Sequence, residues 1–222
     1  KKGASGKTKV FFNAYGGPSR VNGYPEVMNG AEYANQRREA KRAVGQWSGP
    51  ADDATIFSAA ELENIQNNTY TDWQDLVLQD GSQQDYQLGI SSGTDKTNLY
   101  ISFNYFNENG LFKGDQLDRY SFRVNLDHSL SKIVKVGTQT QFTYYDQDIR
   151  FDPMNTVNKL SPLEDAYDED GNIIELVNNG KTVNPLLDTQ NGNYQNNQST
   201  SRVFSSAYLE IKPVSSLSFR SI

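Results

Sequence analysis

Residues 97–146 read TNLYISFNYFNENGLFKGDQLDRYSFRVNLDHSLSKIVKVGTQTQFTYYD, and most of this stretch alternates between apolar and polar side chains. Successive side chains of a β-strand point to opposite faces of its sheet, so a period of two predicts strands. The same period occurs on both sides of the quoted stretch. We therefore predict an all-β chain with seven antiparallel strands, at residues 8–15, 84–92, 97–107, 117–127, 133–146, 201–211 and from 217 onward.

The connections between these predicted strands alternate in length without exception. Three are short, at residues 93–96, 129–132 and 212–216, and three are longer, at residues 17–82, 107–117 and 147–199. Antiparallel strands in chain order would place all the short connections at one end of the sheet and all the long ones at the other. Outer-membrane β-barrels have this layout, with short periplasmic turns and longer extracellular loops. A soluble β-sandwich gives no reason for it.

The composition also favours a membrane-spanning barrel. The chain is 36% hydrophobic with a mean hydropathy of −0.72, yet it holds 13 Tyr and 11 Phe. A barrel strand needs apolar residues only toward lipid, because its other face borders a wet lumen. Disordered chains rarely keep so many aromatic residues. Seven strands would leave bare edges in lipid, and both ends of the chain fall within a pattern, so we expect a piece of a larger barrel.

The alternation assigns side chains to the two faces of the predicted sheet. On the apolar face we predict lipid contact for Ile101, Phe103, Val124 and Val136. Four tyrosines with the same parity lie at the long-loop ends of their strands and predict an aromatic girdle: Tyr86, Tyr105, Tyr120 and Tyr144. Candidate substrate-binding residues are polar side chains toward the lumen and aromatic side chains of the first long loop: Arg123, Gln139, Gln141, Arg202, Trp47 and Tyr24.

Short helices are expected in the first long loop. Asn29 is a suitable N-cap, and Ser58 followed by Glu61 forms a capping box. A third helix should begin at Thr71 or Asp72 and end at Gly81. On this helix, Trp73 is more suited to packing than to stacking on a sugar.

Catalytic and metal chemistry find little support in the sequence, and we expect neither an enzyme nor a bound cofactor. His128 is the only histidine, so a histidine cluster for a metal cannot be built, and the lack of cysteine excludes cysteine-based metal sites. Residues 168–172, DEDGN, suggest a calcium loop, but Ala166 and Val177 would then occupy positions that require carboxylates, so a hairpin turn is favoured. The net charge of −6 without a basic stripe argues against a nucleic-acid partner.

Several stretches resemble the SusC/RagA group of TonB-dependent outer-membrane transporters. They are KKGASGKTKVFFNAYGG (1–17), NGAEYANQRREA (29–40), TDWQDLVLQ (71–79) and, most specifically, the block from residue 83 to residue 142. The resemblance implies that residues 1–7 end a plug domain and residues 8–222 begin a 22-stranded barrel. It further implies an outer-membrane location in a Gram-negative, Bacteroidetes-like bacterium. Import of oligosaccharides or other large nutrients such as peptides would involve a SusD-like surface lipoprotein and the TonB/ExbB/ExbD complex, reached through the plug.

Two other functions remain open at this stage. A structural or adhesive outer-membrane barrel would bind ligands through its long loops without active transport, and it would lack a plug with a TonB box upstream. A soluble glycan-binding β-domain would purify without detergent.

Overall fold

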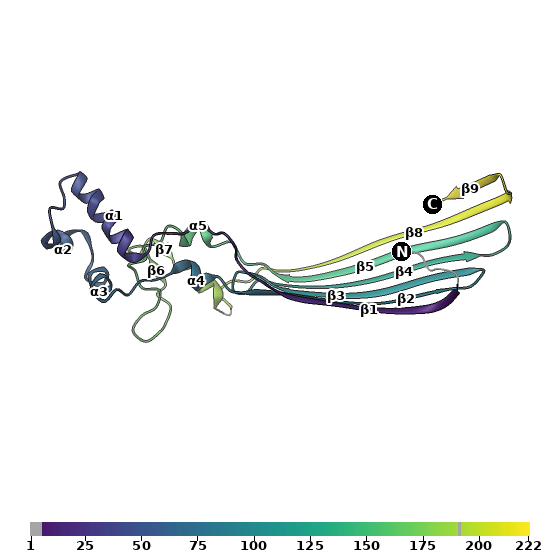
Figure 1. Ribbon diagram of the computed structural model, residues 1–222, viewed down its shortest axis with the longest axis horizontal. Coiled ribbons are helices and arrows are strands. Elements are labelled where there is room, and N and C mark those ends of the chain that lie inside the picture. The colour runs from purple at the N-terminus through teal and green to yellow at the C-terminus, as the bar shows by residue number, and fades with distance from the viewer. Residues whose placement is uncertain (1–5, 191) are drawn as a thin grey trace.

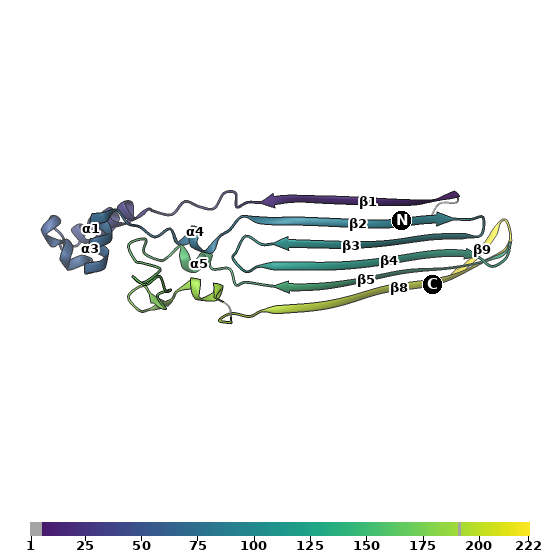
Figure 2. The same cartoon turned by 90° about the horizontal axis from the view of Figure 1, so that it is seen from below.

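The computed structural model of the chain describes residues 6–190 and 192–222. It contains one antiparallel sheet of seven strands in the order β1-β2-β3-β4-β5-β8-β9, so every strand lies beside its neighbour in sequence (Figure 2). The strands are β1 (Gly6–Ser19), β2 (Gly81–Gly93), β3 (Thr97–Asn109), β4 (Gln116–Ser129), β5 (Val134–Asp148), β8 (Asn197–Val214) and β9 (Leu217–Ser221). The predicted seven-stranded antiparallel meander is confirmed, and the sheet is not closed within the described residues.

The strands are longer than the hydrophobic pattern predicted. Six of them run for 13 to 18 residues, because polar residues near the long-loop end continue the ladder. Ser19 still pairs with Gly81, for example, and Asn109 pairs with Gln116. The long connections are correspondingly shorter than expected, at residues 20–80, 110–115 and 149–196. Backbone pairing alone extends a strand here, and it leaves no trace in apolar periodicity.

The register brings side chains of one kind onto one face across the whole sheet. Leu88 pairs with Phe103, Phe103 with Phe122, Phe122 with Phe142, and Phe142 with Val203. We call the face that carries this row the apolar face and the opposite one the polar face. A slip of one residue in any pair would move the row of that strand to the wrong face.

The sheet is curved, with the polar face on the concave side. No described helix covers either face (Figures 1 and 2). Every buried residue in the middle of the sheet belongs to the polar face: Gly89, Tyr100, Ser102, Asp127, Gly137, Thr143 and Tyr208. The large side chains of the apolar face stay exposed, as expected on the convex side of a barrel wall.

Two glycines make room for aromatic rings on the concave face. A Cβ at Gly89 would lie 2.1 Å from the Phe11 ring, and a Cβ at Gly137 would lie 2.2 Å from the Tyr208 ring. The Phe11 ring also stacks on Tyr100, with 6.3 Å between centroids. Rings that lie flat over glycines restore contacts that the missing side chains would have made, a device known from β-sheets.

All described helices lie in the connections between strands. The connection 20–80 holds α1 (Gly30–Ala43), η1 (Pro50–Asp52), α2 (Asp53–Ile56), α3 (Ala59–Asn67) and α4 (Trp73–Val77). The connection 149–196 holds α5 (Met154–Val157), the two-stranded ladder β6 (Leu176–Val177) and β7 (Thr182–Val183), and η2 (Pro185–Thr189). None of these helices combines the length and the hydrophobicity needed to cross a membrane. The long connections gather at one end of the sheet and the short turns at the other (Figure 1).

Replacing Gly89 by alanine tests the close ring contact. The added Cβ would displace the Phe11 ring, and overpacking of this kind costs roughly 1–3 kcal/mol. We expect a smaller assembled fraction of the full-length protein, measured by heat-modifiable mobility in gel electrophoresis. Gly16→Ala is the matched control, because its Cβ would meet its nearest neighbour at an ordinary 3.6 Å. Equal assembly of the two variants would contradict the ring packing.

Candidate functional site

The apolar face is an unusually large exposed hydrophobic surface. More than a third of the surface of each of these side chains is exposed: Val10, Phe12, Leu88, Ile90, Phe103, Phe122, Phe142, Val203, Leu209 and Ile211. Water-soluble monomers rarely expose apolar patches of more than a few hundred Å². The residues predicted to face lipid, Ile101, Phe103, Val124 and Val136, all have the parity of this face. Their contact with lipid stays a prediction, and the geometry is suited to it.

The four predicted girdle tyrosines lie in one row across four strands. Their ring centroids are 6.4, 5.0 and 6.3 Å apart from Tyr86 through Tyr105 and Tyr120 to Tyr144. The hydroxyl of Tyr105 donates to the Asp118 carboxylate at 2.7 Å, toward the long-loop end. Each ring thus has an apolar body on the apolar face and a polar tip near the loops, an arrangement typical of a membrane interface.

The two long connections share one hydrophobic cluster built around Leu163. This side chain is fully buried among Ala34, Trp47, Ile56 and Phe57, all from the connection 20–80. Trp47 is 8% exposed, donates its indole N–H to Asp53 at 2.8 Å, and has the Arg42 guanidinium 4.4 Å from its ring centroid. This placement favours packing over ligand contact for Trp47, whereas Tyr24 is exposed.

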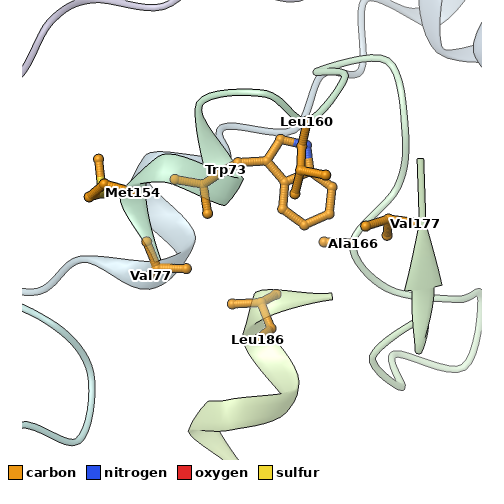
Figure 3. Close-up of a cluster of buried hydrophobic side chains, with 8 residues drawn as sticks. Trp73, Val77, Met154, Leu160, Ala166, Val177 and Leu186 are labelled. Atoms are coloured by element: carbon orange, nitrogen blue, oxygen red, sulfur yellow. The ribbon is translucent and has the colours of Figure 1, made fainter. Parts of the chain in front are cut away.

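A second cluster lies nearer the sheet and again joins the two connections. Trp73 and Val77 of α4 pack against side chains of residues 154–186, namely Met154, Val157, Leu160, Ala166, Val177 and Leu186 (Figure 3). The Trp73 indole N–H donates to the Ser161 carbonyl at 2.9 Å. The expected packing role of Trp73 is thus confirmed.

Hydrogen bonds fix the segment 161–165 against the first connection. The Asn64 side chain donates to the Leu163 carbonyl at 3.1 Å and to the Asp165 carboxylate at 3.0 Å. The Thr71 hydroxyl donates to the Glu164 carbonyl at 2.7 Å. Because both clusters and these bonds need residues from both connections, residues 30–78 and 154–189 fold as one body, which we call the loop unit.

Local capping explains where the helices of the loop unit begin. The capping boxes of Asn29 with Glu32 and of Ser58 with Glu61 are both formed. Asp72 caps α4 by accepting from the backbone N–H groups of Gln74 and Asp75. The prediction that this helix ends at Gly81 is wrong: it ends at Val77, because Leu78 pairs with Phe112 and the Gln79 N–H bonds to the Leu111 carbonyl.

Charged pairs stabilise the loop unit as well. Arg38 and Asp53 approach to 2.5 Å with both side chains largely buried. The hydrogen bond from Arg38 lowers the pKa of the Asp53 carboxyl, and the bond from Trp47 adds to this effect. Asp168 has a lowered pKa mainly through hydrogen bonds from Asn172, within the predicted hairpin turn at residues 168–172. That turn is confirmed by the pairing of Tyr167 with Ile173 and by the positive φ of Gly171.

The loop unit is attached to the sheet through the turn 110–115. Lys113 donates its ammonium to the Leu76 carbonyl at 2.8 Å and its backbone N–H to the Val77 carbonyl at 3.2 Å. Asp115 accepts from the backbone N–H of Arg150, while the Arg150 guanidinium donates to the Asp188 carbonyl at 2.6 Å. Burial raises the pKa of the Asp115 carboxyl, against the opposing effect of Arg150. Sequence analysis missed this role of Arg150, since its acceptors are backbone carbonyls of a distant segment.

A groove of about 580 Å³ crosses the polar face of the sheet below the loop unit. Three of the predicted substrate residues, Arg123, Gln139 and Gln141, line it together with Asn125, Phe204 and Ser206. Arg202 lies two residues from Phe204 on β8, toward the loop end. Phe204 and Ser206 were missed, although continuing the alternation through residues 201–211 places them on this face.

Comparison with known proteins supports the fold and the resemblance. No protein-family model matches the chain. It is 28% identical over 167 residues to TonB-dependent receptor P26 of Formosa agariphila and 31% identical over 138 residues to TonB-dependent receptor P3 of the same organism. These matches cover 75% and 62% of this chain but only 16% and 12% of the two relatives. The chain thus spans less than a fifth of their length.

Solved structures show the same fold. The RagAB peptide importer matches in its closed-closed and in its open-open state, each with a TM-score of 0.74 and 16% sequence identity. Both matches cover 99% of this chain and 28% of the other. The resemblance to the SusC/RagA group of TonB-dependent receptors is therefore confirmed.

Arginine substitution on the two faces tests the assignment of the apolar face to lipid. Val124→Arg should cost roughly 2–4 kcal/mol if the position is near the bilayer midplane. Gln139→Arg, at a solvent-exposed position on the polar face, should be tolerated. The measurement is the assembled fraction of full-length protein in outer-membrane extracts. Similar losses for both variants would reject the assigned faces.

Truncation of Leu163 tests the loop unit. Leu163→Ala removes a fully buried side chain from a cluster built by the other connection, so a loss of about 2–5 kcal/mol is expected. Limited proteolysis should then cut residues 30–70 as well as residues 155–190, with the sheet intact. Leu176→Ala is the control, because Leu176 is 52% exposed. Cleavage confined to residues 155–190 would show that the two connections fold independently.

Proposed function

We propose that this chain, which resembles TonB-dependent receptors in sequence and fold, is the first part of the barrel of an outer-membrane nutrient importer. Residues 8–222 would supply barrel wall and extracellular loops, and residues 1–7 would end the plug or its linker. The apolar face would border lipid in the outer membrane of a Gram-negative bacterium. The polar face would border the lumen of a barrel of about 22 strands, a size that holds a plug.

The observation that carries this proposal is the contrast between the two faces of one curved sheet. A bare apolar face on the convex side requires an apolar solvent, and a polar groove on the concave side requires water or a polar cargo. The relatives P26 and P3 are receptors, and the matching solved structure is an importer, so binding and transport are proposed rather than catalysis.

Passage of cargo would begin at the loop unit and continue along the groove. Ordering the residues of two long connections costs conformational entropy, and the packing of their side chains in the loop unit offsets this free-energy cost. The segment that leads from β1 into the loop unit, with exposed Tyr24, Val27 and Met28, is suited to cargo and to a SusD-like surface lipoprotein. Import of oligosaccharides or peptides against a gradient would draw energy from the TonB/ExbB/ExbD complex through the plug.

Labelling of single cysteines in intact cells tests the proposed orientation. The chain has no cysteine, so Glu169→Cys in the loop unit and Asp95→Cys in a short turn give clean sites once other cysteines of the full-length protein are replaced by serine. A membrane-impermeant maleimide should label the first site in intact cells and the second only after permeabilisation. The reverse pattern, or labelling of both, would contradict the topology.

Uptake measured in the same strains separates import from adhesion. Loss of uptake with retained surface labelling, when the TonB complex is disrupted, supports an importer. Surface binding of cargo that never depends on this complex would instead support the adhesive barrel.

A further inference from the structure

Arg123 and Arg202 differ from most other arginines of the chain in lacking an acidic partner. Five arginines lie within 4.0 Å of a carboxylate: Arg20, Arg37, Arg38, Arg42 and Arg119. Arg150 donates to backbone carbonyls, and Arg220 lies opposite Glu210 in the ladder. Among the described residues, no carboxylate comes within that distance of Arg123 or Arg202.

Within the part of the chain that the structure describes, these two guanidinium groups use little of their hydrogen-bonding capacity. A guanidinium has five N–H donors and no acceptor. Arg123 donates to the Oε1 of Gln141, and the Nε2 of Gln141 donates to the Thr143 hydroxyl at 3.4 Å. The Arg202 guanidinium carbon lies 5.4 Å from the centroid of the Tyr145 ring, and this guanidinium makes no hydrogen bond to another of the described residues. The groove therefore offers a surplus of donors.

The register places the two forks close enough to act on one cargo. Arg123 pairs with Gln141 on β5, and Gln141 pairs with Phe204 on β8, two residues from Arg202. Two strand spacings and two residues along the strand separate the Cα atoms by roughly 12 Å. Long arginine side chains can narrow this gap, and Arg202 lies nearer the loop unit, from which cargo would arrive.

We propose that Arg123 and Arg202 form an anion-recognition site on the polar face that selects cargo bearing carboxylate groups. This inference rests on the proposed transport function and names its substrate class. A carboxylate accepts two parallel hydrogen bonds from a guanidinium fork, whereas a neutral hydroxyl cannot. Gln139, which lines the groove together with Arg123, provides contacts to the neutral parts of the same cargo.

Paired ligands that differ only in charge test the site. Purified full-length protein in detergent is titrated with galacturonate oligosaccharides and their carboxyl-reduced neutral twins, and with Asp-Gly repeat peptides and their Asn-Gly twins. We expect the acid member of at least one pair to bind about tenfold or more tightly than its twin, as for hydrogen bonds to charged groups. Which pair shows the preference tells a glycan cargo from a peptide cargo.

Substitutions then assign the preference to the two arginines. Arg123→Gln with Arg202→Gln should abolish the preference while binding of the neutral twin stays within about twofold. Lys212→Gln is the matched control, since Lys212 carries the same charge on the same strand as Arg202 but pairs with Glu210 at 3.0 Å. Heat-modifiable mobility confirms assembly, and the exposed Arg202→Gln variant alone serves if the double variant fails to assemble.

The inference is overturned if neither pair shows a preference for the acid, or if Lys212→Gln removes that preference as fully as the arginine variants. It is also overturned if the arginine variants weaken acid and neutral ligands alike, since the arginines would then support the barrel or plug. None of these outcomes changes the result expected for surface labelling or for TonB-dependent uptake of a neutral twin. These two measurements therefore test the proposed importer independently of the anion-recognition site.

Discussion

Register between neighbouring strands is the constraint on which the structure depends. Each side chain of β2 to β5 reaches its face only because its strand pairs with both neighbours at one offset. In lipid, backbone N–H and C=O groups must be hydrogen-bonded within the protein. The strand ladder supplies these hydrogen bonds and also sets which face each side chain occupies. The apolar row, the tyrosine row and the groove all run across strands, so each of them is a product of the same offset. Curvature of the sheet brings the side chains of the polar face closer together. Gly89 and Gly137 leave room on this face for the aromatic rings that lie flat over them.

The loop unit is held together by side-chain packing, not by strand pairing. Connections as long as 20–80 and 149–196 cannot be ordered by the sheet, whose contact with them is confined to the rim. Each connection supplies most of the buried residues of one cluster, and the other connection completes that cluster through Leu163 or Trp73, nearly a hundred residues away in sequence. Removing residues 155–195 would therefore unfold residues 30–78 as well, and a deletion of this kind cannot report on one loop alone. Point substitutions at exposed positions separate binding from folding more cleanly.

Sequence periodicity was sufficient for the sheet and insufficient for the loop unit. Alternation in 84–146 predicts strands, faces and neighbours, because a half-exposed strand has only two faces to fill. The N-cap at Asn29 and the capping box at Ser58 also depend on local sequence, and both predictions are confirmed. The end of α4 at Val77 and the polar extensions of the strands depend on backbone pairing with segments far along the chain. Similarly, nothing local distinguishes Leu163 or Arg150 from other loop residues, and nothing local predicts that Trp47, a candidate for substrate binding, packs in the cluster around Leu163.

Attachment of the loop unit to the sheet is narrow, and this bears on how binding at the surface can act on the barrel. The turn 110–115 holds α4, and Arg150 joins that turn to the second connection. A rigid body on a few attachments responds to a ligand by moving as a whole about them, whereas a continuous hydrogen-bonded sheet resists bending. Cargo or a partner on the loop unit would therefore change the opening above the groove without altering the strand register below it. Arg123 in the groove and Arg202 beside it would keep their positions throughout, so in the proposed importer access and selection would be controlled by different parts of the same chain.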